Sequence, residues 1–162
     1  MGFGEAIGSC FRKYAVFRGR APRSEYWYFL LFEFLVSIPA AMIDQAIPGK
    51  TSAISGLVSL AFFLPRLAVT VRRLHDVNRS GWWLGGFFLA VVAGLILIIG
   101  ALGNSLGSNP DFQSPIGLIA AGVLIGAFFY GIWLFVLSVL KGTTGPNDYG
   151  EDPLGSSADV FN

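Results

Sequence analysis

The chain has 162 residues, of which 54% are hydrophobic and only 13% are charged, and its formal net charge is +1. A soluble domain of this size needs far more polar surface, so the composition excludes an ordinary soluble protein and predicts an integral membrane protein. The single cysteine, Cys10, excludes an intramolecular disulfide and a metal site of the zinc-finger type.

The N-terminal segment predicts a short amphipathic helix. Apolar residues recur there at helical spacing, with charged residues on the other faces; the apolar set is Phe3, Ile7, Cys10, Phe11 and Tyr14. Such a helix is typical of the inner membrane surface, and packing against the membrane helices is the alternative.

Four apolar stretches follow, at about 25–43, 51–71, 81–102 and 115–140, and a tail occupies 141–162. Each is near the roughly 20 residues that a helix needs to cross a bilayer. We therefore predict an all-α membrane protein with four transmembrane helices in a single membrane domain, 1–162. Small residues in the last two spans predict close helix packing within the chain, with homodimerisation as the alternative; they are Gly86, Ala90, Gly94, Gly122, Gly126, Ala127 and Gly131.

The basic residues predict the orientation of these spans. Nine of the eleven lie before the first span, between the second and third, or after the fourth: Arg12, Lys13, Arg18, Arg20, Arg23, Arg72, Arg73, Arg79 and Lys141. Lys50 and Arg66 are the other two. Because basic residues collect on the cytoplasmic side of membranes, both termini are predicted to be cytoplasmic.

Three segments at that face carry most of the polar sequence, and we call them the collar: 18–27, 72–83 and 142–152. Three motifs within and beside the collar resemble the signatures of the family called domain of unknown function 805. They are GRAPRSEYWYFLLF from Gly19, RRLHDVNRSGWW from Arg72 and GTTGPNDYGEDP from Gly142. The resemblance covers nearly the whole chain. It implies a small bacterial inner-membrane protein and no established activity.

Arginines of the collar are candidates for binding anionic lipid headgroups or phosphate, because guanidinium groups pair bidentately with phosphate. These are Arg20, Arg23, Arg72, Arg73 and Arg79, and the alternative is that they reflect only the bias of basic residues toward the cytoplasm. A second set is expected to build the structural part of the collar: Trp27, His75, Asp76, Trp82, Trp83, Asn147 and Tyr149.

Acid–base catalysis by His75 and Asp76 is disfavoured, because neighbouring helical residues point in different directions and the sequence places no nucleophile beside them. We therefore predict no catalytic residue and no cofactor. We also predict no metal site, because Asp148, Glu151 and Asp152 lack the spacing of a calcium loop. The acidic tail is instead expected to fold back and neutralise part of the basic segments. A nucleic-acid partner has no supporting module.

Two ionisable residues lie well inside predicted spans. Glu33 and Arg66 sit at equal depths, roughly 9 Å from the boundary at 1.5 Å per residue. We predict that they pair, with Pro65 helping to aim the arginine; the alternative is that Arg66 snorkels to the headgroups.

These features favour a non-enzymatic inner-membrane protein of structural or accessory type, whose collar binds anionic lipids or a membrane-protein partner. Two alternatives stay open. A transporter or channel component needs polar residues that face each other through the bilayer centre. An enzyme acting on a lipid headgroup at the cytoplasmic face would use His75 or Asp76.

Overall fold

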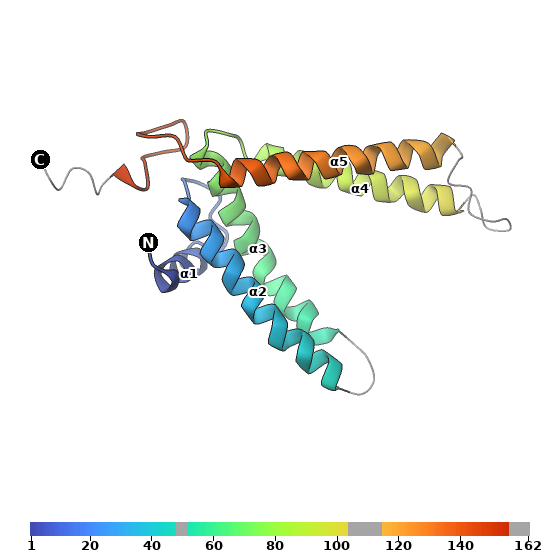
Figure 1. The fold of residues 1–162 in the computed structure, drawn as a ribbon, viewed down its shortest axis with the longest axis horizontal. Coiled ribbons are helices and arrows are strands. Elements are labelled where there is room, and N and C mark those ends of the chain that lie inside the picture. The colour runs from blue at the N-terminus through green and yellow to red at the C-terminus, as the bar shows by residue number, and fades with distance from the viewer. Residues whose placement is uncertain (48–51, 104–114, 156–162) are drawn as a thin grey trace, which may run out of the picture. The chain divides into compact units, whose positions relative to one another are not determined.

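The computed structural model describes residues 1–47, 52–103 and 115–155. In these ranges it contains five helices and no β-strand (Figure 1), namely α1 (Phe3–Arg12), α2 (Arg23–Ala46), α3 (Ala53–Asp76), α4 (Trp82–Gly103) and α5 (Pro115–Val139). Helices α2 to α5 are long and apolar enough to cross a membrane. The prediction of an all-α chain with four long apolar helices is confirmed. Lys50, which the orientation argument set apart from the other basic residues, lies outside the described residues.

Helix α3 continues past the predicted end of its apolar stretch, as far as Asp76. Hydropathy marks the part of a helix that suits hydrocarbon, whereas backbone hydrogen bonding can continue through polar residues beyond it. The helix ends in a Schellman motif, in which Arg79 N–H donates to Leu74 O at 2.9 Å and Asn78 N–H donates to His75 O at 3.0 Å. Asn78 has φ 55°, a left-handed conformation that asparagine tolerates better than most residues.

The chain forms two compact units, the first made of 1–80 and 140–162 and the second of 81–139. In the first unit α1 packs against α2 and α3. The Phe11 ring lies 6.1 Å from those of Phe29 and Phe32 and 6.0 Å from that of Phe62, measured between centroids. Tyr14 O–H donates to Ala61 O at 2.5 Å. Helix α1 is therefore fastened to the α2–α3 hairpin by its apolar face.

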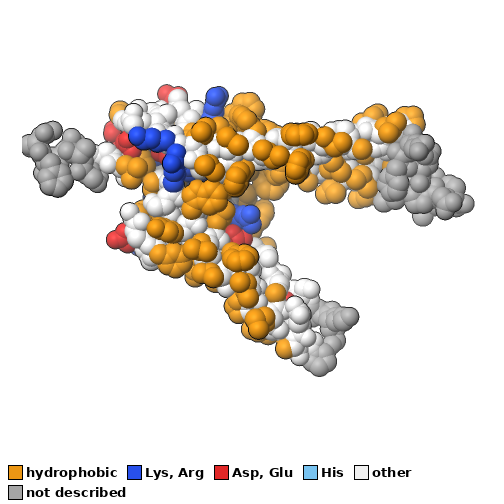
Figure 2. All heavy atoms as spheres, in the orientation of Figure 1, with side chains coloured by type: hydrophobic (Ala, Val, Ile, Leu, Met, Phe, Trp, Pro, Cys, Tyr) orange, Lys and Arg blue, Asp and Glu red, His pale blue; other side chains and the backbone are white. Residues whose placement is uncertain are grey.

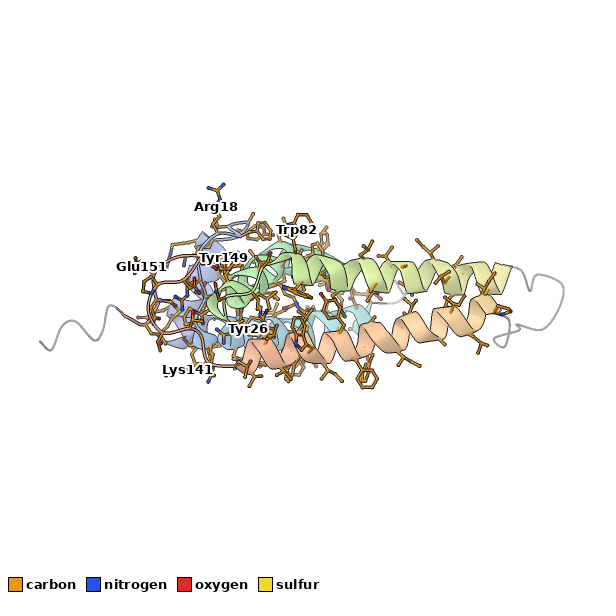
Figure 3. The ribbon with its side chains drawn as sticks, turned by 90° about the horizontal axis from the view of Figure 1, so that it is seen from above. Arg18, Tyr26, Trp82, Lys141, Tyr149 and Glu151 are labelled. Atoms are coloured by element: carbon orange, nitrogen blue, oxygen red, sulfur yellow. The ribbon has the colours of Figure 1, made fainter. Side chains whose placement is uncertain are left out.

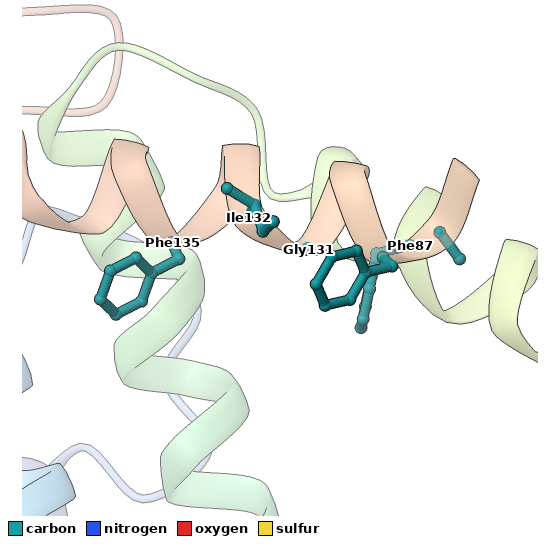
Figure 4. Close-up of a pocket in the computed structure, with 6 residues that line it drawn as sticks. Phe87, Gly131, Ile132 and Phe135 are labelled. Atoms are coloured by element: carbon teal, nitrogen blue, oxygen red, sulfur yellow. The ribbon is translucent and has the colours of Figure 1, made fainter. Parts of the chain in front are cut away.

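The second unit is the α4–α5 hairpin, in which glycines allow close packing. A Cβ at Gly86 would lie 3.2 Å from the Tyr130 hydroxyl, and one at Gly131 would lie 3.1 Å from the Phe87 ring. Gly122 and Gly126 have no such neighbour within 4 Å among the described residues. The predicted small residues thus fall into a packed set and an open set. An apolar pocket of about 310 Å³ lies in this hairpin. It is lined by Phe87, Gly131, Ile132 and Phe135 among others (Figure 4).

The long helices expose apolar surface along most of their length. Figure 2 shows hydrophobic side chains covering their visible faces, with charged side chains gathered in few places. Leu57 and Leu60 of α3 and Leu89 of α4 are among the most exposed. In water such a surface would be unstable, but it suits contact with lipid or with other membrane helices.

Candidate functional site

In the first unit, the backbone joins the three parts of the chain that contain most of the collar. Ala21 N–H donates to Arg72 O at 3.0 Å, so the segment before α2 is attached to the end of α3. Thr143 N–H donates to Asp76 O at 2.8 Å, which attaches the segment after α5 to the same place. Asn147 supplies a side-chain link, from Nδ2 to His75 O at 2.9 Å. The end of α3 is therefore the common anchor.

Asp76 holds two buried arginines at this anchor. Arg20 donates from Nε to Asp76 Oδ1 at 2.9 Å, and its Nη2 lies 2.9 Å from the same oxygen. Arg73 pairs with the other carboxylate oxygen. The side chains of Arg20 and Asp76 are 1% and 6% exposed, so this pair is removed from water. Arg20 also donates to Thr143 O at 2.5 Å and to Gly145 O at 2.6 Å. One arginine thereby ties the tail to α3 through both charge and backbone carbonyls.

Gly142 is needed where the tail passes Asp76. A Cβ at this position would lie 2.6 Å from Asp76 Cγ, which is far inside van der Waals contact. The Leu140 carbonyl, just before this point, accepts hydrogen bonds from Arg23 and Arg73. Only a residue without a side chain lets the backbone come this close to the carboxylate.

A second buried pair fastens α1. Arg72 Nη2 lies 2.9 Å from Glu25 Oε1, and both side chains are 1% exposed. The same carboxylate oxygen accepts from Ser9 Oγ at 3.2 Å and from Cys10 Sγ at 3.7 Å. Burial and the neighbouring charge of Glu25 raise the pKa of Cys10 to about 12. Arg72 also donates to Val16 O at 3.2 Å, so it holds the segment that follows α1.

These five residues, which we call the polar cluster, are Arg20, Glu25, Arg72, Arg73 and Asp76. Buried charges are tolerated when they are paired and hydrogen-bonded, and here carboxylates and backbone carbonyls supply the partners. The sequence makes the collar arginines candidates for headgroup binding, but the structure places Arg20, Arg72 and Arg73 inside the protein. Of the five candidate arginines, Arg23 and Arg79 are exposed. Pairing with carboxylates thus removes three guanidinium groups from the surface.

His75 and Asp76 do not form a dyad with each other. His75 Nδ1 lies 3.1 Å from Gly19 O, and its ring stacks on Tyr149 with 3.9 Å between centroids. A carbonyl has no proton to donate, so we assign the proton to Nδ1. Asp76 points to Arg20 and Arg73 instead. Both residues thus make contacts that hold the tail in place.

The tail folds back as the sequence predicts. The buried Arg20 donates hydrogen bonds to backbone carbonyls of the tail, and no carboxylate of the tail pairs with it in the described residues. Asp152 accepts from Gly145 N–H at 3.0 Å and from Leu154 N–H at 2.9 Å. These two hydrogen bonds hold the pKa of Asp152 below its ordinary value. Asp148 and Glu151 are exposed. Arg20 has five N–H donors in a fixed fork, which suit several carbonyl oxygens at once.

The predicted collar tryptophans lie in different surroundings. Trp27, in the first unit, packs edge-on against Tyr26 with 5.2 Å between ring centroids. In the second unit Trp83 lies 5.0 Å from Trp133, and its carbonyl accepts from Tyr130 O–H at 2.7 Å. Trp82 is 86% exposed. Exposed tryptophan beside the end of an apolar helix is typical of the level of lipid headgroups.

Glu33 and Arg66 meet in the α2–α3 hairpin, well away from the polar cluster along both helices. Arg66 Nη1 lies 3.1 Å from Glu33 Oε1. Pro65 precedes the arginine and is buried inside α3. Unlike the pairs of the polar cluster, this pair is open: the Arg66 side chain is 57% exposed and that of Glu33 is 20% exposed.

Sequence reasoning missed Glu25 and Gly142, although both lie in the quoted signatures. A carboxylate close to several arginines was a usable signal for Glu25. For Gly142 there was no such signal, because a glycine beside Thr143 and before Pro146 is also typical of an ordinary turn.

Comparison with known proteins identifies the family of the chain. A family model described as Protein of unknown function (DUF805) matches residues 14–151, a range that contains the whole polar cluster. The chain belongs to this family. Among relatives of this DUF805 chain, Inner membrane protein YhaI of Escherichia coli (strain K12) is 38% identical over 65% of this chain and 95% of its own length.

Two further relatives come from the same organism. Inner membrane protein YhaH is 35% identical, over 63% of this chain and 93% of its own length. Uncharacterized protein YiiR is 29% identical over 84% of both chains. No solved structure matches this DUF805 chain. Together with the four long apolar helices, the relatives YhaI and YhaH support a membrane protein.

Proposed function

We propose that the chain is a non-enzymatic inner-membrane protein of structural or accessory type, which binds anionic lipid headgroups through an exposed basic rim at the collar end. The rim consists of Arg12, Arg18, Arg23, Arg79 and Lys141, and all five side chains are exposed. The location is supported by the names of the relatives YhaI and YhaH. The bias of basic residues supports an orientation with both termini in the cytoplasm.

One observation carries this proposal: Glu25 and Asp76 are used inside the polar cluster, so neither carboxylate neutralises the rim. Glu25 is paired with Arg72, and Asp76 is paired with Arg20 and Arg73. Within the described residues no member of the rim forms an ion pair. The buried arginines then act as scaffold, and the rim supplies the charge that a headgroup meets.

The arrangement of the rim suits a membrane surface. In Figure 3, Arg18 and Lys141 project from opposite edges of the first unit, and the exposed acid Glu151 lies out along the tail loop. Charges spread around an edge can each reach a different headgroup. Each basic side chain close to an anionic surface contributes about 1 kcal/mol.

The test compares lipid retention by three forms of the protein purified in native nanodiscs. Replacing Arg18, Arg79 and Lys141 by glutamine should lower the proportion of phosphatidylglycerol and cardiolipin around the protein, measured by mass spectrometry. The control changes Arg18 and Arg79 to lysine, which keeps the charge, and should retain the wild-type lipids. An unchanged lipid profile in the glutamine variant, with the protein correctly inserted, would reject headgroup binding by the rim.

A further inference from the structure

The Glu33–Arg66 pair is incompletely satisfied for its place in the chain. Arg66 lies six residues before Arg72 on α3, which at 1.5 Å per residue is roughly 9 Å into the apolar part of the hairpin. Its guanidinium makes one hydrogen bond, to Glu33 Oε1, among the described residues. Four of its five donors and the second oxygen of Glu33 are left without a protein partner there. In hydrocarbon, such groups favour further polar contacts strongly.

The faces around this pair also carry small and polar residues. Ser37 lies one turn beyond Glu33 on α2, and Ser59 lies two turns before Arg66 on α3; both are exposed. Gly56, close to the same face of α3, is exposed, and a Cβ there would meet nothing within 4 Å among the described residues. In membranes, small and hydroxyl residues line helix–helix contacts, because backbones can approach there and hydrogen-bond across.

The second hairpin offers no matching charge. Helices α4 and α5 contain no aspartate, glutamate, lysine, arginine or histidine. Their Tyr130 hydroxyl already donates to Trp83 O at 2.7 Å, and Ser138 Oγ donates to Phe135 O at 2.7 Å. A partner that brings its own carboxylate and guanidinium at the same depth would complete both members of the pair.

We propose that this partner is a second copy of the chain, docked on the α2–α3 face defined by Glu33, Ser37, Gly56, Ser59 and Arg66. A two-fold axis brings the same patch of both copies together. Arg66 of each copy then meets Glu33 of the other, and two open pairs become one closed ring of four alternating charges. The patch is self-complementary in charge, because it carries one acid and one base. A neutral partner helix would bring no charge to pair with either of them. This docking face is independent of lipid binding by the basic rim.

The first experiment reads association between differently labelled copies by fluorescence energy transfer in vesicles. Glu33→Arg places two positive charges on each copy and Arg66→Glu places two negative charges, so either variant alone should associate roughly tenfold or more weakly than wild type. Mixed together, the two variants should regain association, because the opposite charges now lie on different copies. The double variant E33R/R66E restores pairing both within and between copies, and should associate like wild type.

Each result of this experiment decides the question. Energy transfer that is weakened in each single variant, and that returns both in their mixture and in the double variant E33R/R66E, supports the docking face. A monomeric wild-type protein, or single variants that associate as well as wild type, overturns it. If a single variant fails to insert, the neutral double variant E33Q/R66Q replaces it; it introduces no repulsion and should still associate roughly tenfold more weakly.

Cysteine crosslinking provides the second reading of the same face. In a Cys10→Ser background, Ser37→Cys should form a disulfide between copies on oxidation. Leu35→Cys is the matched control, since Leu35 is exposed on the opposite side of α2, two residues away. Equal crosslinking at both positions would show that the copies meet without a preferred face. No crosslinking at Ser37→Cys would show that no second copy docks there. Either result would overturn the proposal.

Discussion

Loss of the Asp76 charge should lower the stability of the protein more than most substitutions, because two buried arginines share this carboxylate. Replacing it by asparagine keeps the shape and removes the charge that faces Arg20 and Arg73, whose side chains are 1% and 0% exposed. Breaking a buried ion pair typically costs about 3–5 kcal/mol. Both arginines keep carbonyl partners in the tail and nearby loops. We therefore expect a loss at the lower end, about 3 kcal/mol in the free energy of unfolding.

The assay is reversible unfolding in mixed micelles as the fraction of denaturing detergent rises, followed by tryptophan fluorescence. Limited proteolysis of the native protein supplies a local readout, because release of the tail from Arg20 should expose residues 142–152 to cleavage. Asp148→Asn is the matched control: it removes an exposed carboxylate from the same tail. If Asp76→Asn unfolds within about 0.5 kcal/mol of wild type and its tail resists protease, the polar cluster does not hold the tail.

Two further predictions test the contacts on either side of this cluster. Gly142→Ala should release the tail to protease, because the added Cβ overlaps the Asp76 carboxyl group, whereas Gly4→Ala, which meets nothing within 4 Å, should not. Cys10 should resist maleimide at pH 8 in the folded protein and react once the detergent unfolds it. With its pKa raised to about 12, only about one thiol in ten thousand is ionised at that pH, and the side chain is buried. Rapid labelling of the native protein would show that α1 leaves the hairpin.

The spans could be predicted closely from sequence because bilayer thickness sets their length, and hydropathy reads that length directly. The approach of Glu33 to Arg66 could also be anticipated, since helical rise gives both residues the same depth on adjacent helices. Both predictions depend on one dimension, the position along the membrane normal. The position of a residue along the membrane normal follows from the apolar stretch around it and from its distance to the end of that stretch.

The polar cluster could not be predicted in the same way, because its contacts depend on direction around the helices and on the path of the loops. Near the end of a span, an arginine that faces lipid headgroups and one that faces a buried carboxylate have the same sequence signature. Arg72 and Arg79 illustrate this: the first is buried against Glu25 and the second is exposed. Hydropathy assigns both of them to the same connection.

The burial of three collar arginines is consistent with the predicted orientation, because the two arguments concern different stages. Basic residues bias topology while the chain inserts, when each guanidinium is still hydrated and unpaired. Once the spans are in place, Arg20, Arg72 and Arg73 can pair with Glu25 and Asp76 without reversing that choice. The same residues can therefore orient the chain first and fasten its tail and first helix afterwards. Only those without a carboxylate partner keep their charge available to a lipid surface.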